Sequence, residues 1–130
     1  MKKQKLLLSD AEPLEKGLQI LLAVSPFFFG LFYPWTSALA AVWLLFLLWR
    51  RRSGLRVPGS LCFLSTASVV LFHLLGIFTG TDRGMAPVGA VQFLPLPLYV
   101  LALEQLEPDR RMRLLRIVPV SGAAMTLVSL

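Results

Sequence analysis

A single histidine inside a long apolar stretch is the most distinctive side chain in this sequence that could carry chemistry. His73 stands in the run LFHLLG, within the uncharged residues 57–81. An ionisable side chain in such a stretch is a candidate functional site, because an apolar environment disfavours it. A neutral imidazole that hydrogen-bonds to a neighbouring helix explains it more simply, since no long apolar stretch contains an acidic residue. We therefore expect a structural role for His73.

Asp82 and Arg83 form a second candidate, in the turn GTDRG between Gly80 and Gly84. An exposed pair of this kind could contact an anionic headgroup or a glycan. More commonly it is a solvated turn in which the Asp caps the following helix. We expect this second arrangement.

Two groups of arginines are candidates for binding anionic lipid. One group is Arg50, Arg51 and Arg52, and the other is Arg110, Arg111, Arg113 and Arg116. Guanidinium clusters beside membrane segments attract anionic headgroups, including a lipid pyrophosphate. Positive charge also gathers at the cytoplasmic ends of membrane helices as a simple consequence of topology. We expect topology to account for both groups.

Gln92, Pro95 and Pro97 interrupt the apolar run VQFLPLPLYV. Prolines free backbone carbonyls, and helices broken in this way can line a polar path. The alternative is a kinked helix that a neighbour repairs, and we favour it. Glu104 follows at the end of this run, where we expect only an interfacial position.

No catalytic triad, paired carboxylates, phosphate-binding glycine loop or zinc-protease motif occurs in the sequence. Cys62 is the only cysteine, and it has no metal-ligand spacing to a histidine. We therefore predict no catalytic, cofactor-binding or metal-binding residue in this chain.

The composition indicates a membrane protein. Hydrophobic residues make up 56% of the 130 residues, and the mean hydropathy is +0.72. Residues 18–49, 57–81 and 84–103 carry no charge and are 32, 25 and 20 residues long, and about 20 residues suffice to cross a bilayer. The net charge of +6 could suggest nucleic acid. We exclude that partner, because the basic residues flank the apolar runs.

Residues 18–49 are too long for a single straight crossing. One helix of this length would span about 48 Å, against a hydrocarbon core of about 30 Å. Pro34 lies in the run SPFFFGLFYPWTSAL and breaks helical hydrogen bonding. A reversal near Tyr33 and Pro34 places 12 of the 13 basic residues on one side, with only Arg83 outside. The positive-inside rule therefore favours a hairpin.

We predict an all-α, polytopic transmembrane helical bundle of about five membrane segments that starts with a short helical hairpin. Residues 1–13 form a cytoplasmic N-terminal segment, in which Ser9 or Asp10 caps a short turn. The transmembrane domain, 14–130, contains segments at 14–32, 35–49, 60–79, 87–106 and 111–130. Pro108 is placed to open a helix before the last of them. Because this segment ends without polar residues, we expect the chain to be incomplete at its C-terminus.

The order of these features resembles the N-terminal part of the bacterial O-antigen ligase/polymerase family. The similar runs are the hairpin LLAVSPFFFGLFYPWTSALAAVWLLFLLWRRR, the outer turn TGTDRGMAPVGAVQFL and the segment EPDRRMRLLRIVPVSGAAMTLVSL. In that family, helices surround a site for lipid-linked glycans. The catalytic arginines and histidine lie in or near a large periplasmic loop in the later half, which this chain lacks.

The resemblance implies that the intact protein transfers a sugar chain from a polyprenyl-pyrophosphate carrier during cell-surface polysaccharide synthesis. It implies a location in the bacterial cytoplasmic (inner) membrane, crossed several times, with a cytoplasmic N-terminus. This chain would be the N-terminal membrane part and inactive alone, with the lipid bilayer and the carrier-linked glycan as partners and no cofactor. The alternative is a small non-enzymatic membrane scaffold or a transporter fragment.

Overall fold

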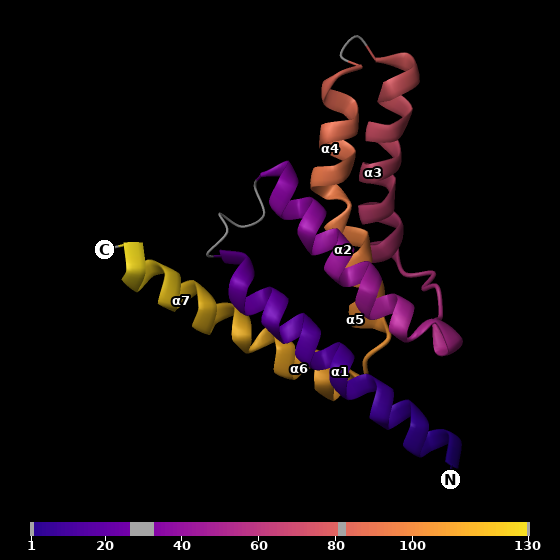
Figure 1. The fold of residues 1–130 in the computed structure, drawn as a ribbon, viewed down its shortest axis with the longest axis vertical. Helices are drawn as coiled ribbons and strands as arrows, with labels where there is room; N and C mark the ends of the chain where they lie inside the picture. The colour runs from indigo at the N-terminus through magenta and orange to yellow at the C-terminus, as the bar shows by residue number, and fades with distance from the viewer. Residues whose placement is uncertain (1, 27–32, 81–82, 130) are drawn as a thin grey trace.

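The computed structural model describes residues 2–26, 33–80 and 83–129, and all regular structure in these residues is helical (Figure 1). The helices are α1 (Lys2–Val24), α2 (Pro34–Arg50), α3 (Leu61–Thr79), α4 (Met85–Phe93), α5 (Pro95–Glu104), α6 (Pro108–Leu115) and α7 (Ile117–Ser129). A short 3-10 helix, η2 (Arg52–Gly54), follows α2. The predicted all-α class is confirmed.

Helix starts follow from local sequence. Pro34 and Pro108 are the first residues of α2 and α6, the position where a missing N–H removes no helical bond. Ser60 caps α3, and its hydroxyl accepts a hydrogen bond from the Phe63 N–H at 3.2 Å. Pro34, Ser60 and Pro108 therefore mark helices that start after a break in the chain, whereas Pro95 follows α4 directly through Leu94.

The buried core joins helices from both ends of the chain. Its members are Leu14 and Leu18 of α1, Leu44, Leu47 and Leu48 of α2, Leu101 and Ala102 of α5, and Leu106 and Leu114. α1 and α2 approach closely at Gly17, where an added Cβ would lie 2.6 Å from Leu47 Cδ1. The Trp43 indole N–H also donates to the Gly17 carbonyl at 3.2 Å. The predicted reversal between these two helices is therefore present.

Figure 1 shows how the helices are arranged. α3 and α4 lie side by side and project beyond the rest of the molecule, with the end of α3 and the start of α4 at the top of the view. α1 lies alongside α6 and α7 and runs in the same direction as they do. The N-terminus, the end of α2 and the start of α6 all lie toward the bottom of the view.

The N-terminal boundary differs from the predicted one. α1 begins at Lys2 and contains Ser9, Asp10 and Pro13, so the predicted cap at Ser9 or Asp10 is wrong, and 2–13 is not separate from the first helix. Pro13 removes only one donor, and the Leu, Ala, Glu and Lys residues around it favour a helix. α1 ends at Val24, and 27–32 of the predicted first segment lie outside the described residues.

The later predicted segments agree better, although two of them are divided. The predicted 35–49 and 60–79 correspond to α2 and α3. The predicted segment 87–106 corresponds to α4 and α5. These two helices meet at Leu94, whose backbone angles, φ −55 and ψ −36, are themselves helical. The predicted 111–130 is α6 and α7, which meet at Arg116.

Two stretches of the described residues are long and apolar enough to cross a membrane. They are α3 and the continuous Met85–Glu104, while α2 is apolar but shorter. By this measure of length and composition, two of the five predicted membrane segments are reproduced.

Candidate functional site

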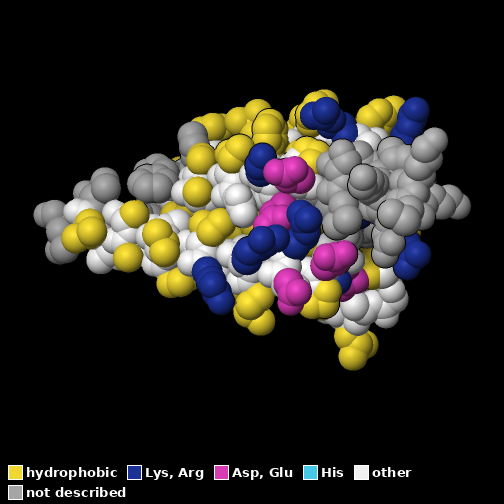
Figure 2. Space-filling model, turned by 90° about the horizontal axis from the view of Figure 1, so that it is seen from below, with side chains coloured by type: hydrophobic (Ala, Val, Ile, Leu, Met, Phe, Trp, Pro, Cys, Tyr) yellow, Lys and Arg dark blue, Asp and Glu magenta, His cyan; other side chains and the backbone are white. Residues whose placement is uncertain are grey.

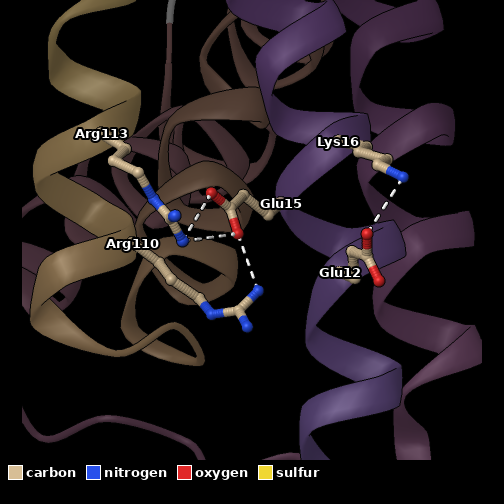
Figure 3. Close-up of polar contacts among 5 residues, drawn as sticks. All are labelled: Glu12, Glu15, Lys16, Arg110 and Arg113. Carbon is tan, nitrogen blue, oxygen red and sulfur yellow. Dashed lines mark hydrogen bonds and ion pairs between the residues drawn. The ribbon is translucent and has the colours of Figure 1, made fainter.

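A buried carboxylate holds two arginines between the first and sixth helices (Figure 3). Glu15 Oε2 accepts a hydrogen bond from Arg110 Nη1 at 2.8 Å, and Glu15 Oε1 lies 3.3 Å from Arg113 Nη2. The exposed fractions of the Glu15 and Arg110 side chains are only 9% and 18%. A carboxylate so withdrawn from solvent requires positive partners.

Sequence reasoning did not single out Glu15. One usable signal was present, since Leu14 and Leu18 are spaced as a buried helical stripe and Glu15 directly follows the first of them. Nothing local indicated that its partners would come from the far end of the chain.

Further polar contacts join helices at the same end of the molecule. The Ser60 hydroxyl, which caps α3, donates to the Glu104 carboxylate at the end of α5. Gln105 clamps the backbone of Arg56, accepting from its N–H at 3.1 Å and donating to its carbonyl at 2.7 Å. Arg111 donates to the Glu104 carbonyl at 3.1 Å. Glu104 is therefore more than an interfacial residue, because it holds α3 against α5.

Arg50 and Arg52 are held differently, by aromatic rings. The Arg50 guanidinium carbon lies 5.8 Å from the ring centroid of Phe46, and that of Arg52 lies 5.1 Å from the ring of Trp49. All four residues are exposed. Cation–π contact therefore orients these guanidinium groups at the surface.

Figure 2 views the molecule from below and shows Lys and Arg side chains beside Asp and Glu side chains on this face, with hydrophobic side chains around them. Positive and negative side chains therefore lie next to one another where α1 meets α6.

His73 packs between α3 and α4. Its Nδ1 lies 2.8 Å from the Val69 carbonyl oxygen of its own helix, so Nδ1 carries the hydrogen in this contact. The ring centroid lies 5.1 Å from that of Phe93, and a Cβ at Gly89 would overlap the imidazole. The structural role is supported, but the predicted bond to a neighbouring helix is wrong, because the nearest acceptor is one helical turn earlier.

The other candidates are not brought together into one site. Arg83 is exposed in the turn before α4, and Asp82, with its predicted cap, lies outside the described residues. Pro95 and Pro97 are buried within α5, which supports the kinked helix over a polar path. Cys62 is exposed near the start of α3.

An apolar crevice of about 220 Å³ lies between α1 and α2, with Leu21, Val24, Leu39 and Trp43 among its walls. Its two hydroxyl groups already bond to backbone, Ser25 to the Leu22 carbonyl and Thr36 to that of Tyr33. It therefore offers an apolar surface rather than a reactive one.

Within the described part of the chain, no group of three or more His, Cys, Asp or Glu residues is arranged to hold a metal ion. A scan against protein-family models, a search of curated proteins and a search of solved structures find no match to this chain. The functional proposal therefore depends on the geometry above and on the resemblance of the sequence runs.

Proposed function

We propose that this chain is a multi-pass protein of a bacterial cytoplasmic membrane and forms the N-terminal helical part of a glycan ligase or polymerase. The enzyme would act on sugar chains linked to polyprenyl pyrophosphate. The membrane part of this proposal and its enzymatic part have different support, and they need separate experiments.

The exposure of α3 carries the membrane part. No residue of this 19-residue helix is buried within the described chain. Its exposed large side chains are Leu61, Leu64, Val69, Leu71, Phe72, Leu74, Leu75 and Phe78. Burying one such side chain stabilises a protein by about 1.5–3 kcal/mol. Leaving all of them in water would forgo a stabilisation as large as the free energy of unfolding of a whole domain, about 5–15 kcal/mol. Exposure to lipid carries no such penalty.

The position of the cations supports a cytoplasmic N-terminus. Arg50, Arg52 and Arg110 lie at the end of the molecule where α2 ends and α6 begins, while Arg83 lies in the turn at the far ends of α3 and α4. The positive-inside rule places the arginine-rich end in the cytoplasm.

The directions of the helices support about five segments. α1 and the α6–α7 pair run the same way (Figure 1), which an odd number of crossings requires of the first and last segments. α2 is short for the hydrocarbon core, so its terminal arginines would lie at headgroup depth.

Cysteine accessibility tests the orientation. In a Cys62→Ser background, Arg83→Cys should react in intact cells with a membrane-impermeant maleimide, whereas Ser53→Cys should react only after permeabilisation. Labelling of Ser53→Cys from outside would contradict the proposed orientation.

The enzymatic part is supported by the resemblance of the three sequence runs alone. Deletion of the encoding gene should shorten or remove the long-chain surface polysaccharide, and the complete gene should restore it. Residues 1–130 alone should not restore it. Unchanged polysaccharide in the deletion strain would contradict the enzymatic role.

A non-enzymatic membrane scaffold is the second candidate. The contacts Glu15–Arg110, Ser60–Glu104 and Gln105–Arg56 each join one helical element to another, as expected of residues that hold a bundle together. This function predicts that gene deletion leaves the polysaccharide intact but reduces the amount of another membrane protein.

A further inference from the structure

Five of the arginines near the end of α2 and in α6 fall into two sets that differ in what holds them. Arg110 and Arg113 share the Glu15 carboxylate, and Arg111 is bonded to a backbone carbonyl at the end of α5. Each of these three arginines donates to an oxygen of another helix, Glu15 of α1 or the Glu104 carbonyl of α5. These side chains serve the packing of α1, α5 and α6.

Arg50 and Arg52 form the second set. Among the described residues, neither lies within 4.0 Å of an acidic oxygen. Their guanidinium carbons lie 5.8 Å and 5.1 Å from the ring centroids of Phe46 and Trp49, and these two residues are themselves 52% and 68% exposed. A cation–π contact uses the charge of a guanidinium rather than its N–H groups as donors to oxygen, so these N–H groups stay available to bind an anion.

We propose that Arg50 and Arg52 bind the phosphodiester headgroup of an anionic phospholipid. This inference rests on the membrane orientation proposed above, which places the end of α2 at the cytoplasmic headgroup layer. Two cations without a carboxylate neighbour complement an anionic headgroup better than a zwitterionic one, whose own ammonium would be repelled.

The rings identify the source of the phosphate as a lipid. Exposed Phe46 and Trp49 flank the two guanidinium groups and would contact the first methylene groups of the lipid chains. Aromatic rings commonly occupy this depth at the membrane interface. A soluble phosphate would engage the guanidinium groups but leave both rings in water.

Native mass spectrometry of the full chain in neutral detergent measures this binding directly. Short-chain phosphatidylglycerol is titrated against phosphatidylcholine, and the apparent Kd of the first bound lipid is determined. Phosphatidylglycerol should bind more tightly. The double variant Arg50→Gln/Arg52→Gln should weaken it about 25-fold, about 5-fold for each arginine near the surface.

Three further variants sharpen the test. Arg56→Gln/Arg116→Gln removes the same charge from two other exposed arginines and should have a much smaller effect. Arg50→Lys/Arg52→Lys keeps the charge but loses the bidentate donor geometry of the guanidinium groups, so it should fall between the wild type and the Gln double variant. Trp49→Leu should weaken binding about 2–5-fold through the lost ring contact.

Equal weakening by the two Gln double variants would overturn the proposal in favour of diffuse electrostatic attraction. Equal affinity for phosphatidylcholine, or displacement of the lipid by inorganic phosphate at similar concentration, would also overturn it.

Alkaline extraction of wild-type membranes distinguishes failure of the headgroup proposal from failure of the proposed membrane function. A chain that resists extraction but shows no lipid preference contradicts only the headgroup site, whereas a chain that is extracted contradicts the membrane function.

Discussion

Glu15 and Arg110 are 95 positions apart in the sequence, and their side chains meet at 2.8 Å in the folded chain. Glu15 follows Leu14 in α1, and Arg110 lies one helical turn before Leu114 in α6; both leucines belong to the buried core. The ion pair therefore sits at the edge of the contact that fixes the first helix against the last ones.

Glu15→Ala should destabilise the protein strongly. The substitution leaves the largely buried Arg110 guanidinium without its carboxylate, and removal of one partner of a buried pair costs about 3–5 kcal/mol. We expect the lower part of this range, because Arg113 is more than half exposed. The free energy of unfolding, measured by denaturant titration in detergent, checks this value.

Glu12→Ala is the matched control for that variant. Glu12 lies one helical turn from Lys16 and pairs with it at 3.2 Å, but both side chains are about two-thirds exposed. Such surface pairs contribute about 0–1 kcal/mol. Equal losses in the two variants would mean that burial of Glu15 has no energetic consequence.

Gly89→Ala should weaken the packing of α3 on α4. The new methyl group would overlap the His73 imidazole, and such overpacking costs about 1–3 kcal/mol. Combining it with His73→Ala should recover much of this loss, because the smaller side chain leaves room for the methyl group. Unfolding free energies of the two single variants and the double variant give the coupling energy.

Gly76→Ala controls for the substitution of a helical glycine. A Cβ at Gly76 would lie 3.6 Å from the Ala86 Cβ, an ordinary contact. This variant should be neutral or gain about 0.5–1 kcal/mol, as expected for alanine over glycine in a helix. A loss as large as that of Gly89→Ala would show that the whole α3–α4 contact, and not the His73 ring, is sensitive.

Gln105→Leu should loosen the connection between α2 and α3. It removes both hydrogen bonds from the side chain to the Arg56 backbone, so trypsin should cleave after Arg52 and Arg56 faster than in the wild type. Gln105→Glu keeps the acceptor and should give an intermediate rate. Cleavage after Arg83, in the turn between α3 and α4, is the internal reference and should not change.

Pro34→Leu should leave the hairpin of α1 and α2 in place. Pro34 is the first residue of α2, and the two helices are also held by the Trp43 bond to Gly17 and by Leu47. A topology reporter fused after Arg56 should therefore report the same side of the membrane as in the wild type. A change of side would show that the proline, rather than helix packing, determines the reversal.

Local sequence determined the class of fold and several boundaries. The length and apolarity of 60–79 predict α3 almost as observed, because hydrophobic length is a property of one continuous segment. Pro108 begins α6 for a similarly local reason. The predicted cap at Ser9 or Asp10 is wrong because α1 continues through both residues and through Pro13, where a favourable helical context on both sides accommodates the proline.

Only the tertiary structure decided which side chains meet. Helical periodicity assigns Glu15 and Arg110 to faces of their helices, but it does not state which helix covers each face. The space that the missing side chain of Gly89 leaves for the His73 imidazole likewise depends on the close approach of α3 to α4. A hydrogen bond or an ion pair forms only within a few ångströms, and packing alone brings residues this far apart in the sequence within that distance.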